Sequence, residues 1–188
     1  MEQETIIKIS KKLSKILRHR PDIIGLTLDE NGWANVHELI KKFGTPPLSE
    51  GVLADSILAL KTVVAENDKK RFAFNDDFSK IRANQGHSVD IDLALAASEP
   101  PALLFHGTAR KSLESIKNQG LIKGSRQHVH LSKDEQTAVR VGGRHGIAVV
   151  LKVNAKEMFE AKNYPFFISD NGVWLTDHVP VRFIIFPT

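Results

Sequence analysis

The sequence predicts an α+β fold in two lobes, residues 1–90 and residues 98–188. Three observations indicate this arrangement. The first lobe begins with apolar residues at helical spacing and ends in short runs typical of strands, whereas the second lobe consists mostly of short strands between a few helices. The stretch VDIDLALAASEPP, residues 89–101, has little periodicity and closes with Pro100-Pro101, so we expect it to link the two lobes.

Three helices are expected in the first lobe. Apolar residues at helical spacing over the first eighteen residues predict an amphipathic helix, which Pro21 ends. The stretch NVHELIKKF predicts a second helix with Asn35 as its N-cap, broken by Pro46-Pro47. Ser49 is the expected N-cap of a third helix.

Short strands are expected after these helices. The runs TVVAEN, KRFAFN and SKIRANQ, between residues 62 and 85, are divided by Asn-Asp and Asp-Asp pairs that favour turns, and they predict a small antiparallel sheet. Helices followed by a hairpin resemble a winged helix. That module often binds nucleic acid, but it also serves as a plain scaffold.

The second lobe alternates between strands and helices. Strands are predicted at ALLFHGT, HVHLS, IAVVLKV, YPFFIS, GVWLT and RFIIF, and helices at KSLESIKNQG and DEQTAVRVGG. Gly120 is expected to stop the first of these helices, and IAVVLKV is expected to be a buried strand. The sequence contains no internal repeat and no low-complexity segment.

The composition excludes several classes of chemistry. The 188 residues include no cysteine, which removes disulfides, thiolate nucleophiles and cysteine-ligated zinc or iron–sulfur sites. No apolar run approaches the ~20 residues needed to cross a bilayer, and the N-terminus has no signal-peptide core, so we expect a soluble cytoplasmic protein without a membrane partner. The formal net charge of +4 permits an anionic partner such as RNA or DNA.

Four stretches concentrate polar and charged residues beyond what folding requires: LRHRP (17–21), KIRANQGHS (80–88), FHGT (105–108) and VGGRHG (141–146). Arg71 adds a fifth position. Each guanidinium presents a planar fork of donors that suits a phosphate, and two or three together suit a dianion. A set of arginines with a histidine therefore favours a site that handles phosphate.

Each of these stretches also has a purely structural explanation. Arg18 and His19 suit the negative end of a helix dipole without any ligand. Arg71 suits an exposed position, and the glycines of VGGRHG suit a helix C-cap. Three further residues suit a loop whose side chains bond their own backbone: Asn84, Gln85 and His87.

The stretch FHGT follows directly on an apolar run. Gly107 would let a ligand approach the backbone closely, and the side chains beside it offer a donor and an acceptor. A metal site is the alternative, built from His106, His128, His130 and His145. No two of these histidines are spaced i, i+4 and no acidic residue accompanies them, so we expect no metal.

Taken together, the motifs resemble those of the NAD-dependent RNA 2′-phosphotransferase family, which completes tRNA splicing in eukaryotes and fungi. The stretches LRHRP, KRF, IRANQGHS, FHGT, HVHLS, VGGRHG and GVWLTDHVP occur in the family's order, from about Lys11 to Ile185. IRANQGHS and HVHLS are the specific ones. The resemblance implies a winged-helix-like first lobe that binds RNA and phosphate, and an ADP-ribosyltransferase-like second lobe that binds NAD, with the two facing each other across a substrate cleft.

The resemblance also implies roles for individual residues. The family's catalytic set of three arginines and a histidine falls on Arg18, His19, Arg71 and Arg144. Arg20 lies outside that set. NAD is expected against His106, Gly107, Thr108, His130 and Ser132. RNA contacts are expected at Arg82, Asn84, Gln85 and His87. Because the catalytic set is divided between the lobes, the resemblance implies that both lobes close on the phosphate.

The reaction that the resemblance implies has two steps. An internal RNA 2′-phosphate attacks NAD+ and expels nicotinamide, which leaves an ADP-ribosylated RNA 2′-phosphate. The ribose 2″-hydroxyl then attacks phosphorus, yielding ADP-ribose 1″,2″-cyclic phosphate and RNA with a 2′-hydroxyl. The arginines would clamp the phosphate, and His19 would bind it or move a proton. The expected enzyme is a monomer that uses NAD as co-substrate, needs no metal, and acts on RNA such as spliced tRNA.

Two other functions stay open at this point. Broader ADP-ribosyltransferases often carry a glutamate where GVWLT has Val173, and its absence argues against general modification of proteins. An enzyme that ADP-ribosylates phosphate ends of nucleic acids would still use the same NAD pocket. A non-catalytic winged-helix binder of nucleic acid would explain the first ninety residues, but it leaves FHGT, HVHLS and VGGRHG without a purpose.

Overall fold

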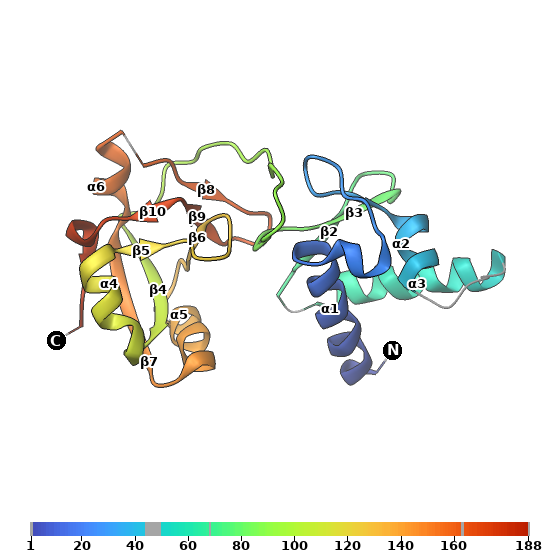
Figure 1. The fold of residues 1–188 in the computed structure, drawn as a ribbon, viewed down its shortest axis with the longest axis horizontal. Coiled ribbons are helices and arrows are strands. Elements are labelled where there is room, and N and C mark those ends of the chain that lie inside the picture. The colour runs from blue at the N-terminus through green and yellow to red at the C-terminus, as the bar shows by residue number, and fades with distance from the viewer. Residues whose placement is uncertain (1, 44–49, 68, 163, 188) are drawn as a thin grey trace. The chain divides into compact units, whose positions relative to one another are not determined.

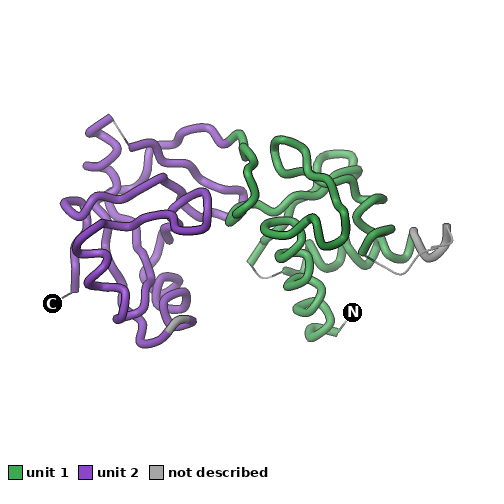
Figure 2. The backbone as a smooth tube through the Cα atoms, viewed as in Figure 1, with its two compact units in different colours: residues 1–94 green, residues 95–188 purple. Residues whose placement is uncertain are grey.

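The protein forms two compact units in the computed structural model, which describes residues 2–43, 50–67, 69–162 and 164–187. Unit 1 comprises residues 1–94 and unit 2 residues 95–188 (Figure 2). Helices and short antiparallel strands occur in both units, which confirms the predicted α+β class. Among the described residues, no helix is both long and apolar enough to span a membrane.

Unit 1 combines helices with one small antiparallel sheet (Figure 1). Its elements are α1 (Gln3–Arg18), η1 (Pro21–Ile24), β1 (Ala34–Asn35), α2 (Val36–Phe43), α3 (Glu50–Ala65), β2 (Phe72–Phe74) and β3 (Lys80–Ala83). The strand order is β1-β3-β2, and Ile81 of β3 pairs with Ala34 on one side and Phe74 on the other. Strand β3 is therefore the central strand of this sheet.

Helix α1 matches its prediction closely. Its apolar stripe is buried, with Leu13, Ile16 and Leu17 each exposing 2% of their surface or less. The helix ends at Arg18, where the backbone N–H of His19 still donates to the carbonyl of Lys15. Because the buried stripe fixes the rotation of the helix about its axis, it also determines the direction in which the last residues of the helix point.

Helix α2 begins where predicted, but the third helix differs from its prediction. Asn35 is the N-cap of α2, since its side-chain oxygen accepts a hydrogen bond from the N–H of Glu38 at 2.9 Å. Pro46-Pro47 and Ser49 lie outside the described residues. The strand predicted at TVVAEN is wrong, because α3 continues through Ala65. Val63 is fully buried one turn after buried Leu60, so helical packing overrides the strand preference of its β-branched side chain.

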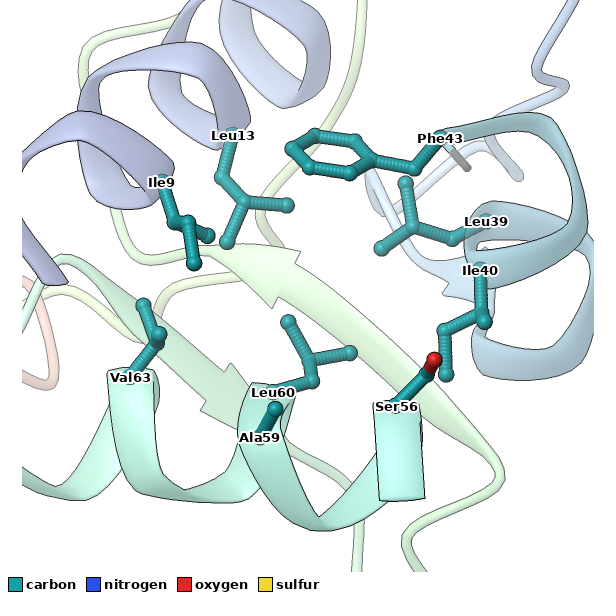
Figure 3. A pocket seen from close by; sticks show the side chains of 9 residues that line it. All are labelled: Ile9, Leu13, Leu39, Ile40, Phe43, Ser56, Ala59, Leu60 and Val63. Carbon is teal, nitrogen blue, oxygen red and sulfur yellow. The ribbon is translucent and has the colours of Figure 1, made fainter. Parts of the chain in front are cut away.

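The core of unit 1 contains a small apolar cavity. It has a volume of about 190 Å³ and lies between α1, α2 and α3 (Figure 3). Its lining comprises Ile9, Leu13, Leu39, Ile40, Phe43, Ser56, Ala59, Leu60 and Val63. Only one of these side chains is polar, so an anion there would lose its hydration without gaining partners. This cavity belongs to the packing of the helices and offers nothing to a phosphate.

Unit 2 contains several short antiparallel sheets with helices packed on them (Figure 1). Its strands are β4 (Leu103–Ala109), β5 (Leu121–Ile122), β6 (Val129–Leu131), β7 (Ala148–Asn154), β8 (Phe167–Ile168), β9 (Trp174–Thr176), β10 (His178–Val179) and β11 (Ile184–Ile185). Its helical segments are η2 (Arg110–Ser112), α4 (Leu113–Gln119), α5 (Glu135–Gly142), η3 (Gly143–His145), α6 (Ala155–Glu160) and η4 (Val181–Phe183). The sheet orders are β11-β7-β4, β6-β9-β8 and β10-β5.

Most elements predicted for unit 2 are present. Gly120 ends α4 with a φ of 75°, and Asp134 caps α5 by accepting from the N–H of Thr137 at 2.7 Å. The strand β7 is less buried than predicted, because Leu151 and Val153 are fully buried whereas Lys152 between them is exposed. The short elements β5, β10 and α6 were not predicted, and the run RFIIF is a strand only at Ile184–Ile185.

The first part of the predicted linker contacts unit 1, and its second part contacts unit 2. Leu93 is 6% exposed, and its carbonyl accepts a hydrogen bond from Arg82. Further along, the N–H of Ser98 donates to the carbonyl of Phe166 at 2.8 Å. The chain therefore passes from unit 1 to unit 2 within this stretch, between residues 94 and 95.

Helix α5 lies directly on strand β4 without a layer of side chains between them. A Cβ atom at Gly107 would stand 1.7 Å from the carbonyl oxygen of Ala138, and one at Gly142 would stand 2.7 Å from the carbonyl oxygen of Thr108. Both contacts are with backbone, which cannot rotate away. The close approach expected at Gly107 is thus made by a helix of the protein itself.

We predict that Gly107→Ala destabilises the protein by about 3 kcal/mol or more, because its Cβ overlaps backbone and α5 must move off β4. The measurement is the free energy of unfolding in urea, followed by circular dichroism. Gly143→Ala is the matched control, since Gly143 has a φ of −63° and nothing lies within 4 Å of its Cβ position. Equal stability of the two variants would show that a Cβ atom at Gly107 does not overlap the backbone of α5.

Candidate functional site

Three basic residues, Arg18, His19 and Arg20, follow one another at the C-terminal end of α1 and are held in different ways. The guanidinium of exposed Arg20 makes a bidentate pair with Asp22, with distances of 2.9 Å and 2.8 Å to the two carboxylate oxygens. His19 is exposed, whereas Arg18 is partly buried. Positive charge at this helix end is favoured by the backbone dipole. Arg20 thus has a carboxylate partner two residues further along the chain.

A loop after β3 holds the end of α1. The N–H groups of Ser88 and Val89 both donate to the carbonyl of Arg18, at 2.9 Å and 3.4 Å. The hydroxyl Oγ of Ser88 lies 2.9 Å from Nδ1 of His19. The loop therefore satisfies a carbonyl that the helix end leaves open, and it contacts the side chain of the next residue.

His87 is buried beneath this positive group. Its side chain is 1% exposed, and neither ring nitrogen has a hydrogen-bond partner among the residues described. Burial, followed by the charges of Arg18, His19 and Arg82, lowers the pKa of His87 to about 3. The ring is therefore neutral at physiological pH and adds no charge to its cationic neighbours.

Two other predicted arginines of unit 1 are oriented by specific contacts. The guanidinium carbon of Arg82 lies 4.5 Å from the centre of the Trp33 ring, a cation–π arrangement. Arg71 donates to the hydroxyl of Ser10 at 3.2 Å. Ser10 lies eight residues before Arg18 on α1, about 12 Å along the axis. The contact thus places Arg71 against α1, the helix that ends at Arg18.

Asn84 supports the backbone at Arg71. Its side chain donates to the carbonyl of Lys70 at 2.7 Å, and its N–H donates to the carbonyl of Arg71 at 2.9 Å. Lys70 has a positive φ of 40°, a conformation that such contacts help to hold. Asn84 is only 4% exposed and His87 1%. Both lie beneath the surface, behind the arginines, while Gln85 is partly buried.

In unit 2, two histidines of the predicted NAD site are joined by a hydrogen bond between strands of two different sheets. His106 of β4 donates from Nδ1 to the carbonyl of His130 in β6 at 3.0 Å. A carbonyl oxygen only accepts, so Nδ1 carries the proton and Nε2 is an acceptor in the neutral ring. Burial is the largest effect that lowers the pKa of His106, and the charge of Arg126 adds to it. His106 therefore offers an acceptor at neutral pH.

His130 has the opposite arrangement. Nη1 of Arg126 lies 2.7 Å from Nδ1 of His130, and a guanidinium only donates. Nδ1 of the neutral ring is therefore the acceptor in this contact, and Nε2 carries the proton. One histidine presents an acceptor at Nε2 and the other a donor, a combination that suits neighbouring hydroxyl groups of a sugar.

The other predicted residues of unit 2 lie next to this pair along the chain or the sheet. Backbone hydrogen bonds of 2.9 Å and 2.7 Å join Phe105 and Ser132 in both directions, so FHGT and HVHLS lie side by side. Gly142 packs on the backbone of Thr108, which brings VGGRHG against FHGT. Arg144 follows in η3 and is exposed. Within the described part of the chain, no group of three potential metal ligands occurs.

The comparison with known protein families assigns this combination of motifs. A family model described as "RNA 2'-phosphotransferase, Tpt1 / KptA family" matches residues 4–178. The chain belongs to this family. The match covers all four motifs and both units, which confirms the resemblance found in the sequence and places the chain among transferases.

Several bacterial relatives of the Tpt1/KptA family resemble the chain over nearly its whole length. A protein of Flavobacterium johnsoniae is 52% identical over 186 residues, which covers 99% of each chain. A protein of Burkholderia pseudomallei is 50% identical and covers 96% of this chain and 95% of its own. A protein of Fusobacterium nucleatum is 49% identical and covers 96% and 98%. All three bear the name "Probable RNA 2'-phosphotransferase".

The sequence analysis missed three polar residues that hold the predicted ones: Ser10, Ser88 and Arg126. Ser88 closes the stretch IRANQGHS, so its motif was noticed but its partner was not. Ser10 lies on the apolar face of α1, where a buried hydroxyl is a signal of a polar partner. Arg126 gave no signal, because it belongs to no recognised motif.

We predict that His87 makes the protein less stable in acid. The folded-state pKa of about 3 lies below the ordinary value of 6.5, so the unfolded chain binds a proton first as the pH falls. Stability is complete above pH 6.5 and is lost progressively between pH 6.5 and pH 3. Between pH 7 and pH 4.5 this single group should cost about 2–3 kcal/mol of unfolding free energy.

The measurement is urea unfolding of the wild type and His87→Leu at the two pH values. The Leu side chain cannot titrate, so the variant should lose less stability between pH 7 and pH 4.5 than the wild type does. His37→Gln is the control, since His37 is exposed on α2 and its replacement should leave the acid dependence unchanged. Identical pH dependence in all three proteins would contradict a buried, neutral His87.

Proposed function

We propose that the protein transfers an internal RNA 2′-phosphate to NAD+. The products are nicotinamide, ADP-ribose 1″,2″-cyclic phosphate and RNA with a 2′-hydroxyl, formed through an ADP-ribosylated RNA 2′-phosphate. The observation that carries the proposal is the family match over residues 4–178, in which the chain retains every motif that bears charge or hydrogen-bonding chemistry. The motifs' side chains are also of the types that the two steps require.

Unit 1 is proposed to hold the 2′-phosphate, as a winged-helix-like module whose charged residues face the RNA. Arg18, His19 and Arg71 are the proposed contacts, and Arg82 and Gln85 are proposed to meet the RNA beside them. Supporting this, Arg71 donates to Ser10 of α1, the helix that ends at Arg18, and the buried His87 is kept neutral. Asn84 and His87 are proposed to act from below, by fixing the residues that touch the ligand.

Unit 2 is proposed to bind NAD as an ADP-ribosyltransferase-like module. His106 and His130 support this, because their Nε2 atoms form an acceptor and a donor that suit the hydroxyls of a ribose. Thr108 and Ser132 are the proposed polar neighbours, with Gly107 as the point where β4 and α5 meet. Val173 stands where a protein-modifying relative would carry glutamate, which suits an acceptor that brings its own negative charge.

Each proposed step balances without a metal. In the first, a phosphate oxygen bonds to the anomeric carbon of the nicotinamide ribose, and nicotinamide leaves as a neutral molecule with the electrons of the broken C–N bond. In the second, the ribose 2″-oxygen bonds to phosphorus, the bond from phosphorus to the RNA 2′-oxygen breaks, and the hydroxyl proton ends on that 2′-oxygen. Arg18, Arg71 and Arg144 are assigned to the phosphate charge.

We predict that the protein converts NAD+ and an oligonucleotide with one internal 2′-phosphate into the three products named above. Mass spectrometry of the RNA and chromatography of the nucleotides measure them. An oligonucleotide with only 2′-hydroxyls is the control and should release no nicotinamide. A stable ADP-ribosylated RNA without cyclic phosphate would favour an ADP-ribosyltransferase that stops after one step, and binding without nicotinamide release would favour a plain nucleic-acid binder.

We also predict that two neighbouring arginines differ sharply in their importance. Arg18→Ala should lower the rate of 2′-phosphate removal by at least about 100-fold, because one charge-stabilising donor contributes ~3 kcal/mol or more to such a transition state. Arg20→Ala should stay near the wild-type rate, since the exposed Arg20 guanidinium is engaged by Asp22. Single-turnover kinetics measure both. A similar loss of rate in the two variants would contradict the proposal that Arg18 contacts the phosphate and Arg20 does not.

A further inference from the structure

The side-chain contact between Ser88 and His19 differs from the backbone contacts by which the same loop holds α1. The backbone N–H of Ser88 binds the carbonyl of Arg18, whereas its side-chain hydroxyl lies 2.9 Å from Nδ1 of His19. The two residues are 69 positions apart in the sequence, so the fold itself brings them together. The backbone contact accounts for capping of the helix. The side-chain contact does not serve that purpose.

We propose that the Ser88 hydroxyl is a positioning residue that fixes the ring orientation and tautomer of His19. The inference rests on the proposed function, in which His19 meets the RNA 2′-phosphate. In this arrangement the hydroxyl donates to Nδ1, and the single N–H of the neutral imidazole is placed on Nε2, across the ring. An N–H at Nε2 is the group that an anionic phosphate oxygen accepts from.

The local structure supports such a role for the side chain. His19 is the first residue after α1, with φ −129° and ψ −42°, so the helix does not restrain its side chain as it would in the interior. Both His19 and Ser88 are exposed, so the core does not enclose the ring. A hydrogen bond from a loop that is itself anchored to Arg18 supplies a restraint on its orientation.

The residue before Ser88 helps to explain why the loop can hold a fixed position. His87, immediately before Ser88, is buried to 1% exposure. A buried ring on one side and two N–H bonds to Arg18 on the other leave the Ser88 hydroxyl little freedom. The restraint on His19 is therefore prepared before any ligand binds.

The test compares three side chains at position 88. Ser88→Thr keeps the hydroxyl, and Ser88→Val has nearly the same shape as threonine but cannot form the hydrogen bond. Because Ser88 is exposed and its N–H is retained, all variants should fold with wild-type unfolding midpoints. In Ser88→Val, kcat for 2′-phosphate removal should fall about 10- to 100-fold while KM for NAD+ stays unchanged, and Ser88→Thr should restore most of the rate.

A second readout does not depend on activity. The ¹⁵N chemical shifts of the His19 ring, assigned by their loss in His19→Ala, report which nitrogen carries the proton. In the wild type and Ser88→Thr, Nδ1 should behave as an unprotonated acceptor and Nε2 as the protonated nitrogen. In Ser88→Val the shifts should move toward a mixture of the two tautomers.

Ser79→Ala is the matched control in unit 1. Ser79 is also exposed, and its hydroxyl accepts a hydrogen bond from Asn75 at 3.1 Å, so the variant loses a comparable contact away from α1. It should alter neither kcat nor the His19 shifts. Wild-type kcat and unchanged ring shifts in Ser88→Val would overturn the inference. A wild type that leaves 2′-phosphorylated RNA unchanged would contradict the proposed function instead, and the ring shifts would still decide whether Ser88 orients His19.

Discussion

Positive charge collected at one helix end is the constraint on which the arrangement of unit 1 depends. Arg18 and Arg82 are near enough to His87 to lower its pKa, so these cations also repel one another. Three features limit this repulsion: the negative end of the α1 dipole, the aromatic face of Trp33 against Arg82, and a histidine that stays neutral. None of these removes the charge. Because the cations at this surface repel one another, a dianion that binds there would reduce their repulsion.

The NAD site proposed for unit 2 depends on neutral donors and acceptors. Its central pair, His106 and His130, carries no obligatory charge, and the position of each proton follows from what Nδ1 contacts. A carbonyl of the sheet sets the tautomer of one histidine, and Arg126 sets that of the other. Electrostatic attraction is indifferent to the fine orientation of a phosphate, whereas a donor beside an acceptor is sensitive to the arrangement of hydroxyls. In the proposed function, unit 1 would thus supply strength of binding and unit 2 selectivity.

Local rules predicted the elements whose causes are local. The apolar stripe of α1, the Asn35 cap of α2 and the Gly120 stop of α4 each depend on residues within a few positions, and all three are present. The two-residue strands β5 and β10 exist only because they pair with each other across the fold, and TVVAEN became helical because Val63 packs in a core. The same distinction holds for the site. Motifs named Arg18 and His19, but the serine that contacts His19 lies 69 residues away.

The bare contact between α5 and β4 limits how this part of the molecule can change over generations. Most helix–sheet interfaces can drift, since a larger side chain on one side is compensated by a smaller one on the other. At Gly107 and Gly142 there are no side chains to exchange, so the spacing of helix and strand has no adjustable part. Arg144 follows this fixed helix by two residues, in a turn bounded by Gly143 and Gly146. The position of the Arg144 guanidinium can therefore change during evolution only through that turn, because the position of α5 on β4 is fixed.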